Sequence, residues 1–108
     1  MNEVLLALCR HCVSIMDGWV PYPATVMSKA HGWPYRRTLN ELHKLEEAGY
    51  VRLSTITTGE YPLPIRGWTI TKKAKKTDEY NKAYEKEREI VLDVFGWDIV
   101  EESKNGID

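Results

Sequence analysis

The feature that most constrains the fold is a change in hydrophobic period near Gly49. Across residues 35–48, leucines and an alanine recur every third or fourth position, which is the spacing of an amphipathic helix. Gly49 ends this helix, and residues 50–57 are rich in the β-branched and aromatic side chains of a β-strand. The period therefore predicts a chain of α+β class.

Ahead of this central helix the sequence predicts two more helices. An apolar stripe from Val4 to Met16 has helical spacing and stops at Asp17-Gly18. Two prolines exclude a helix over residues 19–23, which leaves room for a very short edge strand. A second helix starts at about residue 24, ends at residue 30 or 31, and is followed by a tight turn. Pro34 suits the first position of the central helix, where its missing N–H costs nothing.

After the central helix the sequence predicts a hairpin and a long last helix. Residues 65–71 form a second strand, and a loop with glycine and two prolines joins it to the first. Thr77 caps a helix over about residues 78–95, whose first turn is acidic, as the helix dipole prefers. Gly96 ends that helix, and residues 97–108 form an acidic tail.

Size and charge limit the classes of protein that fit. The 108 residues, 43% of them apolar, make one domain, and no apolar run is long enough to span a bilayer. The N-terminus lacks the basic start of a signal peptide, so we expect a cytoplasmic protein. Residues 1–76 hold eleven Lys and Arg against six Asp and Glu, whereas residues 77–108 hold four against ten. This asymmetry indicates two different surfaces and is compatible with an anionic partner for the first.

Two stretches of sequence resemble a known architecture. TLNELHKLEEAGYVRL (residues 38–53) resembles the recognition helix and following strand of small bacterial winged-helix regulators, and RGWTITKKAKK (residues 66–76) resembles their second wing strand. The pattern is similar to the PadR-like and MarR-like families and covers roughly residues 1–95. The chain departs from them at Lys73-Ala74-Lys75, where those families usually place a glycine.

The resemblance implies a mostly helical α+β fold, a winged helix-turn-helix with a three-helix core, a β-hairpin wing and an added C-terminal helix. It divides the chain into a DNA-binding domain (1–76), a C-terminal helix for dimerisation (77–96) and an acidic tail (97–108). We expect a transcriptional regulator that binds a specific double-stranded DNA sequence as a homodimer.

In that fold the third helix enters the major groove, and the wing contacts the phosphate backbone. Arg and Asn side chains there suit guanine and adenine, whereas Lys44 is better placed for a phosphate. The alternative is an ordinary solvated helix face, which the glutamates of the same helix favour. The expected DNA-binding residues are Tyr35, Arg36, Arg37, Asn40, His43, Lys44, Arg66 and Lys72.

Self-association is expected through the last helix, whose apolar side chains call for a partner surface. That partner is helix 1 of the same chain, helix 1 of a second copy, or the last helix of a second copy. A twofold dimer would match a palindromic site. The expected dimerisation residues are Tyr80, Tyr84, Val91 and Phe95. The alternative function is a winged-helix protein–protein adaptor, for example from a phage or mobile element, that does not bind DNA.

No constellation of residues points to catalysis, a metal or a cofactor. Cys9-Arg10-His11-Cys12 looks like a metal or redox motif, but no further pair of ligands follows, and both cysteines continue an apolar stripe. We therefore interpret them as buried core thiols. The aromatics Trp19, Trp33 and Trp68 are expected in the core.

Overall fold

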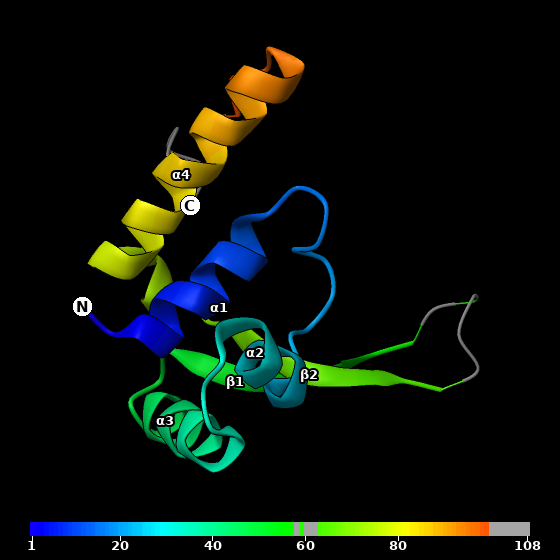
Figure 1. The fold of residues 1–108 in the computed structure, drawn as a ribbon, viewed down its shortest axis with the longest axis vertical. Helices are drawn as coiled ribbons and strands as arrows, with labels where there is room; N and C mark the ends of the chain where they lie inside the picture. The colour runs from blue at the N-terminus through cyan, green and yellow to red at the C-terminus, as the bar shows by residue number, and fades with distance from the viewer. Residues whose placement is uncertain (58, 60–62, 100–108) are drawn as a thin grey trace.

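A computed structural model describes residues 1–57, 59 and 63–99. Tyr61 at the tip of the predicted hairpin and most of the predicted acidic tail lie outside this range. The described residues form an α+β fold that is mostly helical, which confirms the predicted class (Figure 1). In chain order the elements are α1 (Glu3–Val13), α2 (Ala24–His31), α3 (Tyr35–Glu47), β1 (Val51–Ile56), β2 (Ile65–Ile70), the 3₁₀ helix η1 (Lys73–Lys76) and α4 (Asp78–Phe95).

The ends of α3 and α4 follow from local signals in the sequence. Gly49 has φ +87°, a left-handed conformation that glycine adopts without strain, and this turns the chain from α3 into β1. The backbone N–H of Tyr50 donates to the carbonyl of Leu45 over 2.9 Å and closes the helix end. Thr77 accepts a hydrogen bond from the N–H of Tyr80 through its hydroxyl and caps α4 at the predicted residue.

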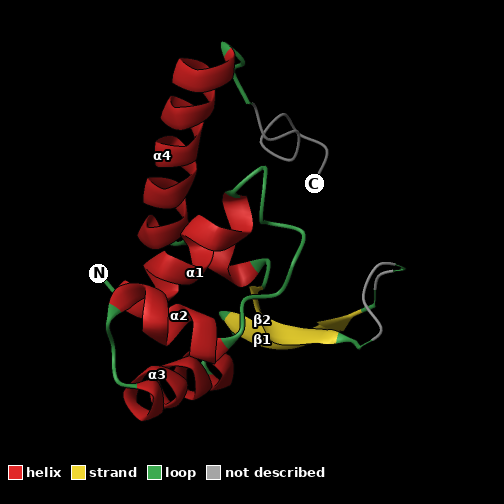
Figure 2. Cartoon of the chain, turned by 45° about the vertical axis from the view of Figure 1, so that its right-hand side comes forward, coloured by secondary structure: helices red, strands yellow, loops and turns green. Residues whose placement is uncertain are grey.

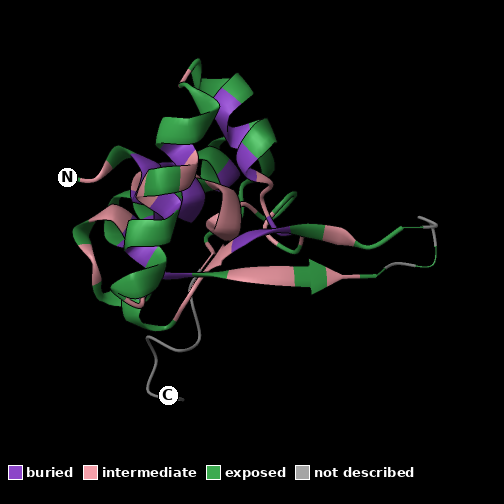
Figure 3. Cartoon of the chain, turned by 90° about the horizontal axis from the view of Figure 1, so that it is seen from below, coloured by how far each residue is buried: buried purple, intermediate pink, exposed green. Residues whose placement is uncertain are grey.

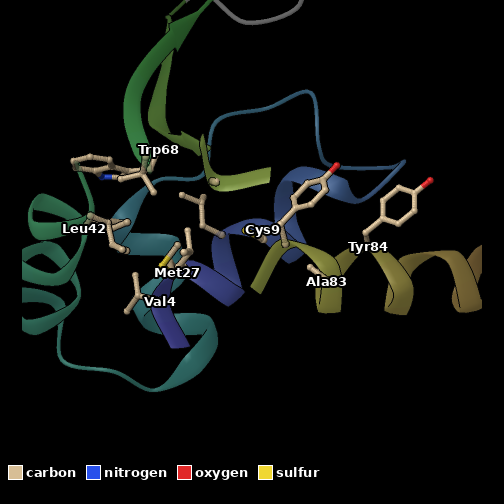
Figure 4. Packing of buried hydrophobic residues seen from close by; sticks show 14 residues of the cluster. Val4, Cys9, Met27, Leu42, Trp68, Ala83 and Tyr84 are labelled. Atoms are coloured by element: carbon tan, nitrogen blue, oxygen red, sulfur yellow. The ribbon is translucent and has the colours of Figure 1, made fainter. Parts of the chain in front are cut away.

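Helix α1 is the centre of the core. It lies between α4 on one side and the α2–α3 pair on the other (Figure 2). Leu8 and Cys9 of α1 are completely buried, and side chains from the other elements close around them (Figure 4). Each large apolar side chain buried this way contributes about 1.5–3 kcal/mol. The neighbours include Met27 of α2, Leu42 of α3, Trp68 of β2, and Ala83 and Tyr84 of α4.

The hairpin projects from the helical body, with its buried residues at the base (Figures 1 and 3). The strands are antiparallel, with Val51 opposite Ile70 at the base and Ile56 opposite Ile65 toward the tip. Tyr22, in the segment between α1 and α2, exchanges two backbone hydrogen bonds of 2.9 Å with Trp68. The predicted short edge strand is reduced to this single bridge, which attaches the hairpin to the start of α2.

The first helix is shorter than predicted. It ends at Val13 because Ser14 adopts an extended conformation, and its hydroxyl accepts the N–H groups of Met16 and Asp17 over 3.3 Å each. Such local side-chain bonds compete with helical ones. Ile15 and Met16 are therefore exposed rather than part of the apolar stripe.

The predicted tryptophan core is only partly right. Trp68 is buried and Trp33 packs against the core, but Trp19 is 62% exposed and does not belong to it. Helix α1 ends at Val13, three residues before the end of the apolar stripe at Met16, and Trp19 lies on the loop that follows. No helix among the described residues combines the length and the apolar character needed to cross a bilayer.

Most of the expected dimerisation residues are used inside the chain. Tyr80 and Tyr84 are buried in the core that α4 shares with α1, and Val91 is also buried. These three side chains have no surface left to offer a second copy. Of the predicted set only Phe95, which is 46% exposed and stacks on Trp97, remains accessible.

We predict that Gly67→Ala destabilises the fold, because a Cβ atom there would lie 2.6 Å from the backbone carbon of Tyr22 and 2.7 Å from the nitrogen of Pro23. The bridge to Trp68 would have to open or shift, so we expect a loss of about 1–3 kcal/mol in urea unfolding. Gly59→Ala is the control, since no atom lies within 4 Å of its added Cβ. Equal stabilities of the two variants would contradict the role of the bridge.

Candidate nucleic-acid interface

The outer face of α3 carries the predicted base-reading side chains. Thr38, Leu42 and Leu45 are buried against the rest of the chain, which turns the opposite side of the helix outward. Arg36 and Asn40 lie on that outer side, one turn apart, and both are exposed. Across the described residues, neither side chain has a hydrogen-bond or ion-pair partner. The face is therefore open to an external ligand.

The two neighbouring arginines point in different directions. Consecutive helical residues are separated by about 100°, so Arg37 is rotated from Arg36 toward α1. Arg37 lines a hollow of about 260 Å³ together with Glu3, Trp33 and Glu41. It remains exposed and forms no ion pair with any described residue, but two carboxylates share its surroundings. Arg36 is thus the freer of the two.

Two further polar side chains of α3, Lys44 and His43, have acidic neighbours. The Nζ of Lys44 lies 3.5 Å from Glu41, and the Nδ1 of His43 lies 3.3 Å from Glu46. Exposed pairs of this kind contribute at most about 1 kcal/mol, so an incoming phosphate can displace them. Lys44 and His43 therefore stay available, at a modest cost.

A second hollow, which we call the α3–hairpin hollow, lies between α3 and the face of the hairpin that turns toward it. Residues opposite each other in the ladder share a face, so the pairing of Leu53 with Trp68 and of Thr55 with Arg66 places Arg66 on the same side as the buried indole. The ring of His43 meets Trp68 edge-on at 5.4 Å. The hollow measures about 380 Å³ and is lined by Pro23, Ala24, Thr25, Tyr35, Leu39, His43, Leu53, Arg66, Gly67 and Trp68.

This hollow brings three predicted DNA-binding residues together, namely Tyr35, His43 and Arg66. Sequence reasoning missed Leu39 and Leu53 as parts of the same surface. Their apolar character suggested only core positions, yet both are partly exposed. Leu53 and Thr55 are two residues apart in β1, so their side chains lie on the same face of the hairpin. Which face this is follows only from the pairing of β1 with β2.

Lys72 does not join this group. It follows Thr71, which donates through its N–H to the carbonyl of Tyr50 and through its hydroxyl to that of Gly49. Lys72 therefore lies near the C-terminal end of α3, whereas Arg36 is in its first turn. The neighbouring Lys73 donates to the carbonyl of Ala48 over 2.5 Å, which makes it a cap for α3.

The acidic helix α4 lies away from α3. Helix α4 is on the far side of α1 from α3 (Figure 2). The segment after α4 turns back along it: Arg88 holds Asp98 through two hydrogen bonds of 2.6 and 2.9 Å, and the pKa of Asp98 is lowered by this pairing. Among the described residues, the acidic helix α4 and the basic N-terminal half of α3 are therefore separated in space.

The cysteines have the environment of core thiols. Cys9 is completely buried, and desolvation raises its pKa to about 12. Cys12 is partly buried, its Sγ lies 3.7 Å from the hydroxyl of Thr69, and burial raises its pKa as well. Both thiols are free, and the described part of the chain holds no group of three or more His, Cys, Asp or Glu residues arranged to bind a metal.

We predict that Cys9 is chemically inert in the folded protein. A rise in pKa from 9.0 to about 12 lowers the reactive thiolate fraction about a thousandfold at pH 8. A Cys12→Ser variant isolates Cys9, whose reaction with a disulfide reagent should be at least that much slower in the native chain than in guanidinium chloride. Rapid native labelling would show that the thiol is activated.

A scan against protein-family models and searches of curated proteins and of solved structures gave no match to this chain.

Proposed function

We propose that the chain is a winged helix-turn-helix domain that binds double-stranded DNA in a sequence-specific way and regulates transcription as a homodimer. The order of elements supports this proposal: three helices, then a hairpin that Tyr22 extends by one bridging residue, then an added helix. Helices α2 and α3 pack together across a short turn, in the manner of the two helices of a helix-turn-helix. Residues 1–76 form the DNA-binding part in this account.

The observation that carries the proposal is the open outer face of α3. The major groove admits an α-helix, and bidentate contacts from Arg to guanine and from Asn to adenine distinguish base pairs. Arg36 and Asn40 supply these two side chains one turn apart, in the first half of the helix, without a described partner to remove. Arg37 and Lys44 flank them and suit phosphates.

A second copy of the chain is proposed to dock at the apolar end of α4, which we define as Ile90, Val94, Phe95 and Trp97. All four are at least 43% exposed, and at helical spacing Val94 and Phe95 continue the stripe that Tyr84 and Val91 begin. Exposed apolar patches of this kind mark interaction sites.

The chain's own α1 covers only the first part of this stripe. A twofold pairing would cover the rest of both copies with one self-complementary patch. Charge repulsion between the two copies does not prevent this pairing, because the charged residues near the patch, Lys86, Glu89 and Asp93, include both signs.

Replacing Arg36 and Arg37 by Ala should weaken DNA binding at least tenfold, because the Arg36 contact to a base contributes about 1–3 kcal/mol and the Arg37 contact to a phosphate adds to it. The probe is a duplex enriched by the wild-type chain from a random 30-bp pool, followed in a mobility-shift assay. Lys82→Ala with Lys86→Ala is the control, since it removes the same charge from α4. Both variants should unfold like the wild type.

Unchanged binding by the arginine variant would remove the proposal. A wild-type chain that enriches no duplex from the pool would favour the alternative function, a protein–protein adaptor that docks its partner on the apolar end of α4.

Phe95→Glu should convert the dimer to a monomer, because a carboxylate in an apolar contact is left desolvated and unpaired. Sedimentation velocity at 20–200 μM should give twice the 12.5 kDa chain mass for the wild type and the chain mass for the variant. Leu63→Glu is the control, as Leu63 is 74% exposed on the hairpin loop. A wild-type chain that stays monomeric at 200 μM would contradict this interface.

A further inference from the structure

We infer that residues 97–99 form a latch, which the ion pair between Arg88 and Asp98 holds closed over a hollow beside Cys12 and which high ionic strength opens. The inference goes beyond the proposed function and does not rest on it. It gives a role to an ion pair that neither the base-reading face of α3 nor the core uses.

The segment that follows α4 runs back along the helix (Figure 2). Gly96 has φ +71° and reverses the chain, and Asp98 then accepts two hydrogen bonds from Arg88, of 2.6 Å from Nε and 2.9 Å from Nη2. The next residue, Ile99, accepts a hydrogen bond of 3.1 Å through its carbonyl from the hydroxyl of Tyr84. Because Tyr84 and Arg88 are one turn apart, these bonds hold the segment against one side of α4.

The latch adjoins a hollow of about 400 Å³, which we call the Cys12 hollow. Residues of α1, β2 and α4 line it, and Ile99 of the latch completes the lining. Thr69 follows the buried Trp68 in β2, so strand alternation turns its side chain to the face of the hairpin away from α3. There its hydroxyl lies 3.7 Å from the Sγ of Cys12. The Cys12 hollow and α3 are therefore on opposite faces of the hairpin.

The ion pair is the part of the latch that responds to salt. The side chains of Arg88 and Asp98 are 43% and 48% exposed, so dissolved ions reach both of them. Attraction between exposed charges is screened beyond about 10 Å at 0.1 M salt and beyond about 3 Å at 1 M salt. The bond from Tyr84 to Ile99 joins uncharged groups and lacks this dependence. Screening of the pair therefore shifts the latch toward its open state.

The same latch positions Trp97. This residue precedes Asp98, so the pairing with Arg88 fixes the backbone that carries the indole, and the indole stacks on Phe95 at 5.1 Å. Both aromatic rings belong to the apolar end of α4. One ion pair thus controls two features, closure of the Cys12 hollow and assembly of the apolar patch. Opening the latch with salt would therefore weaken docking on this patch, although an apolar contact is not itself screened.

The test uses Cys12 as a reporter of the open state. The chain at about 5 μM and pH 8 is treated with iodoacetamide, an uncharged reagent whose approach does not depend on salt. Trypsin cleaves after Arg10, so mass spectrometry measures the labels on Cys9 and Cys12 on separate peptides. Cys9 is completely buried and reports global unfolding in the same sample.

Asp98→Asn should label Cys12 about two- to fivefold faster than the wild type in 50 mM KCl, the range for loss of one exposed ion pair. In 500 mM KCl the wild type should reach the rate of the variant, and the rate of the variant should not change. Asp93→Asn is the control, because Asp93 is also exposed on α4, loses the same charge and has no partner among the described residues.

A second variant tests whether Arg88 and Asp98 act as one unit. Arg88→Gln should accelerate the labelling of Cys12 to the same extent as Asp98→Asn. The double variant should be no faster than either single variant, because the pair is already lost in each of them. Accelerations that multiply would show that the two residues act independently, which would overturn the latch.

The remaining outcomes are equally decisive. Salt-independent labelling of wild-type Cys12, or equal rates for Asp98→Asn and Asp93→Asn, would overturn the inference. Equal acceleration of Cys9 would also overturn it, because the whole chain would then be opening. These rates are measured without DNA, so a chain that enriches no duplex would leave the latch intact, and failure of the latch would leave DNA binding by α3 intact.

Discussion

The position of Trp68 is the constraint on which the rest of the structure depends. Its indole is only 3% exposed, its backbone exchanges two hydrogen bonds with Tyr22, and its ring meets His43 of α3 edge-on. One residue thereby ties together the hairpin, the segment that leads into α2, and the outer helix α3. Because strand side chains alternate, burial of Trp68 also determines which way its neighbours face, and Arg66 and Leu53 follow it onto the α3 side. Gly67 is required beside it, since any side chain there would strike the backbone of Tyr22.

Elements with strong local signals could be predicted closely from the sequence. Helix α2 ends at His31 before Gly32, and α4 runs from Asp78 to Phe95 between a threonine cap and Gly96, as expected. These boundaries are set by backbone conformations and caps that a few adjacent residues determine. The end of α1 was predicted wrongly because the apolar spacing continued to Met16, while the hydroxyl of Ser14 bonded locally and ended the helix.

The candidate site needed information that a sequence does not carry. Arg36 and Arg37 are adjacent and chemically identical, and the burial of Thr38, Leu42 and Leu45 decides which of them faces outward and which faces α1. The α3–hairpin hollow depends on the placement of a strand about 25 residues away along the chain. For α4 the pattern predicts an apolar stripe but leaves open whether α1 of the same chain or a second copy covers it, so the expected dimerisation residues include Tyr80, Tyr84 and Val91, which the chain buries itself.

In the proposed arrangement, α3 and the hairpin form the side that faces DNA, and the acidic helix α4 with its apolar end lies on the far side of α1. The most direct measurement is an NMR titration of the ¹⁵N-labelled chain with a random-sequence 20-bp duplex in 50 mM salt. We predict that the amide signals that shift first belong to the outer face of α3 and to the hairpin around Leu53 and Arg66. A titration that leaves these signals unmoved, or that shifts only α4, would contradict the account.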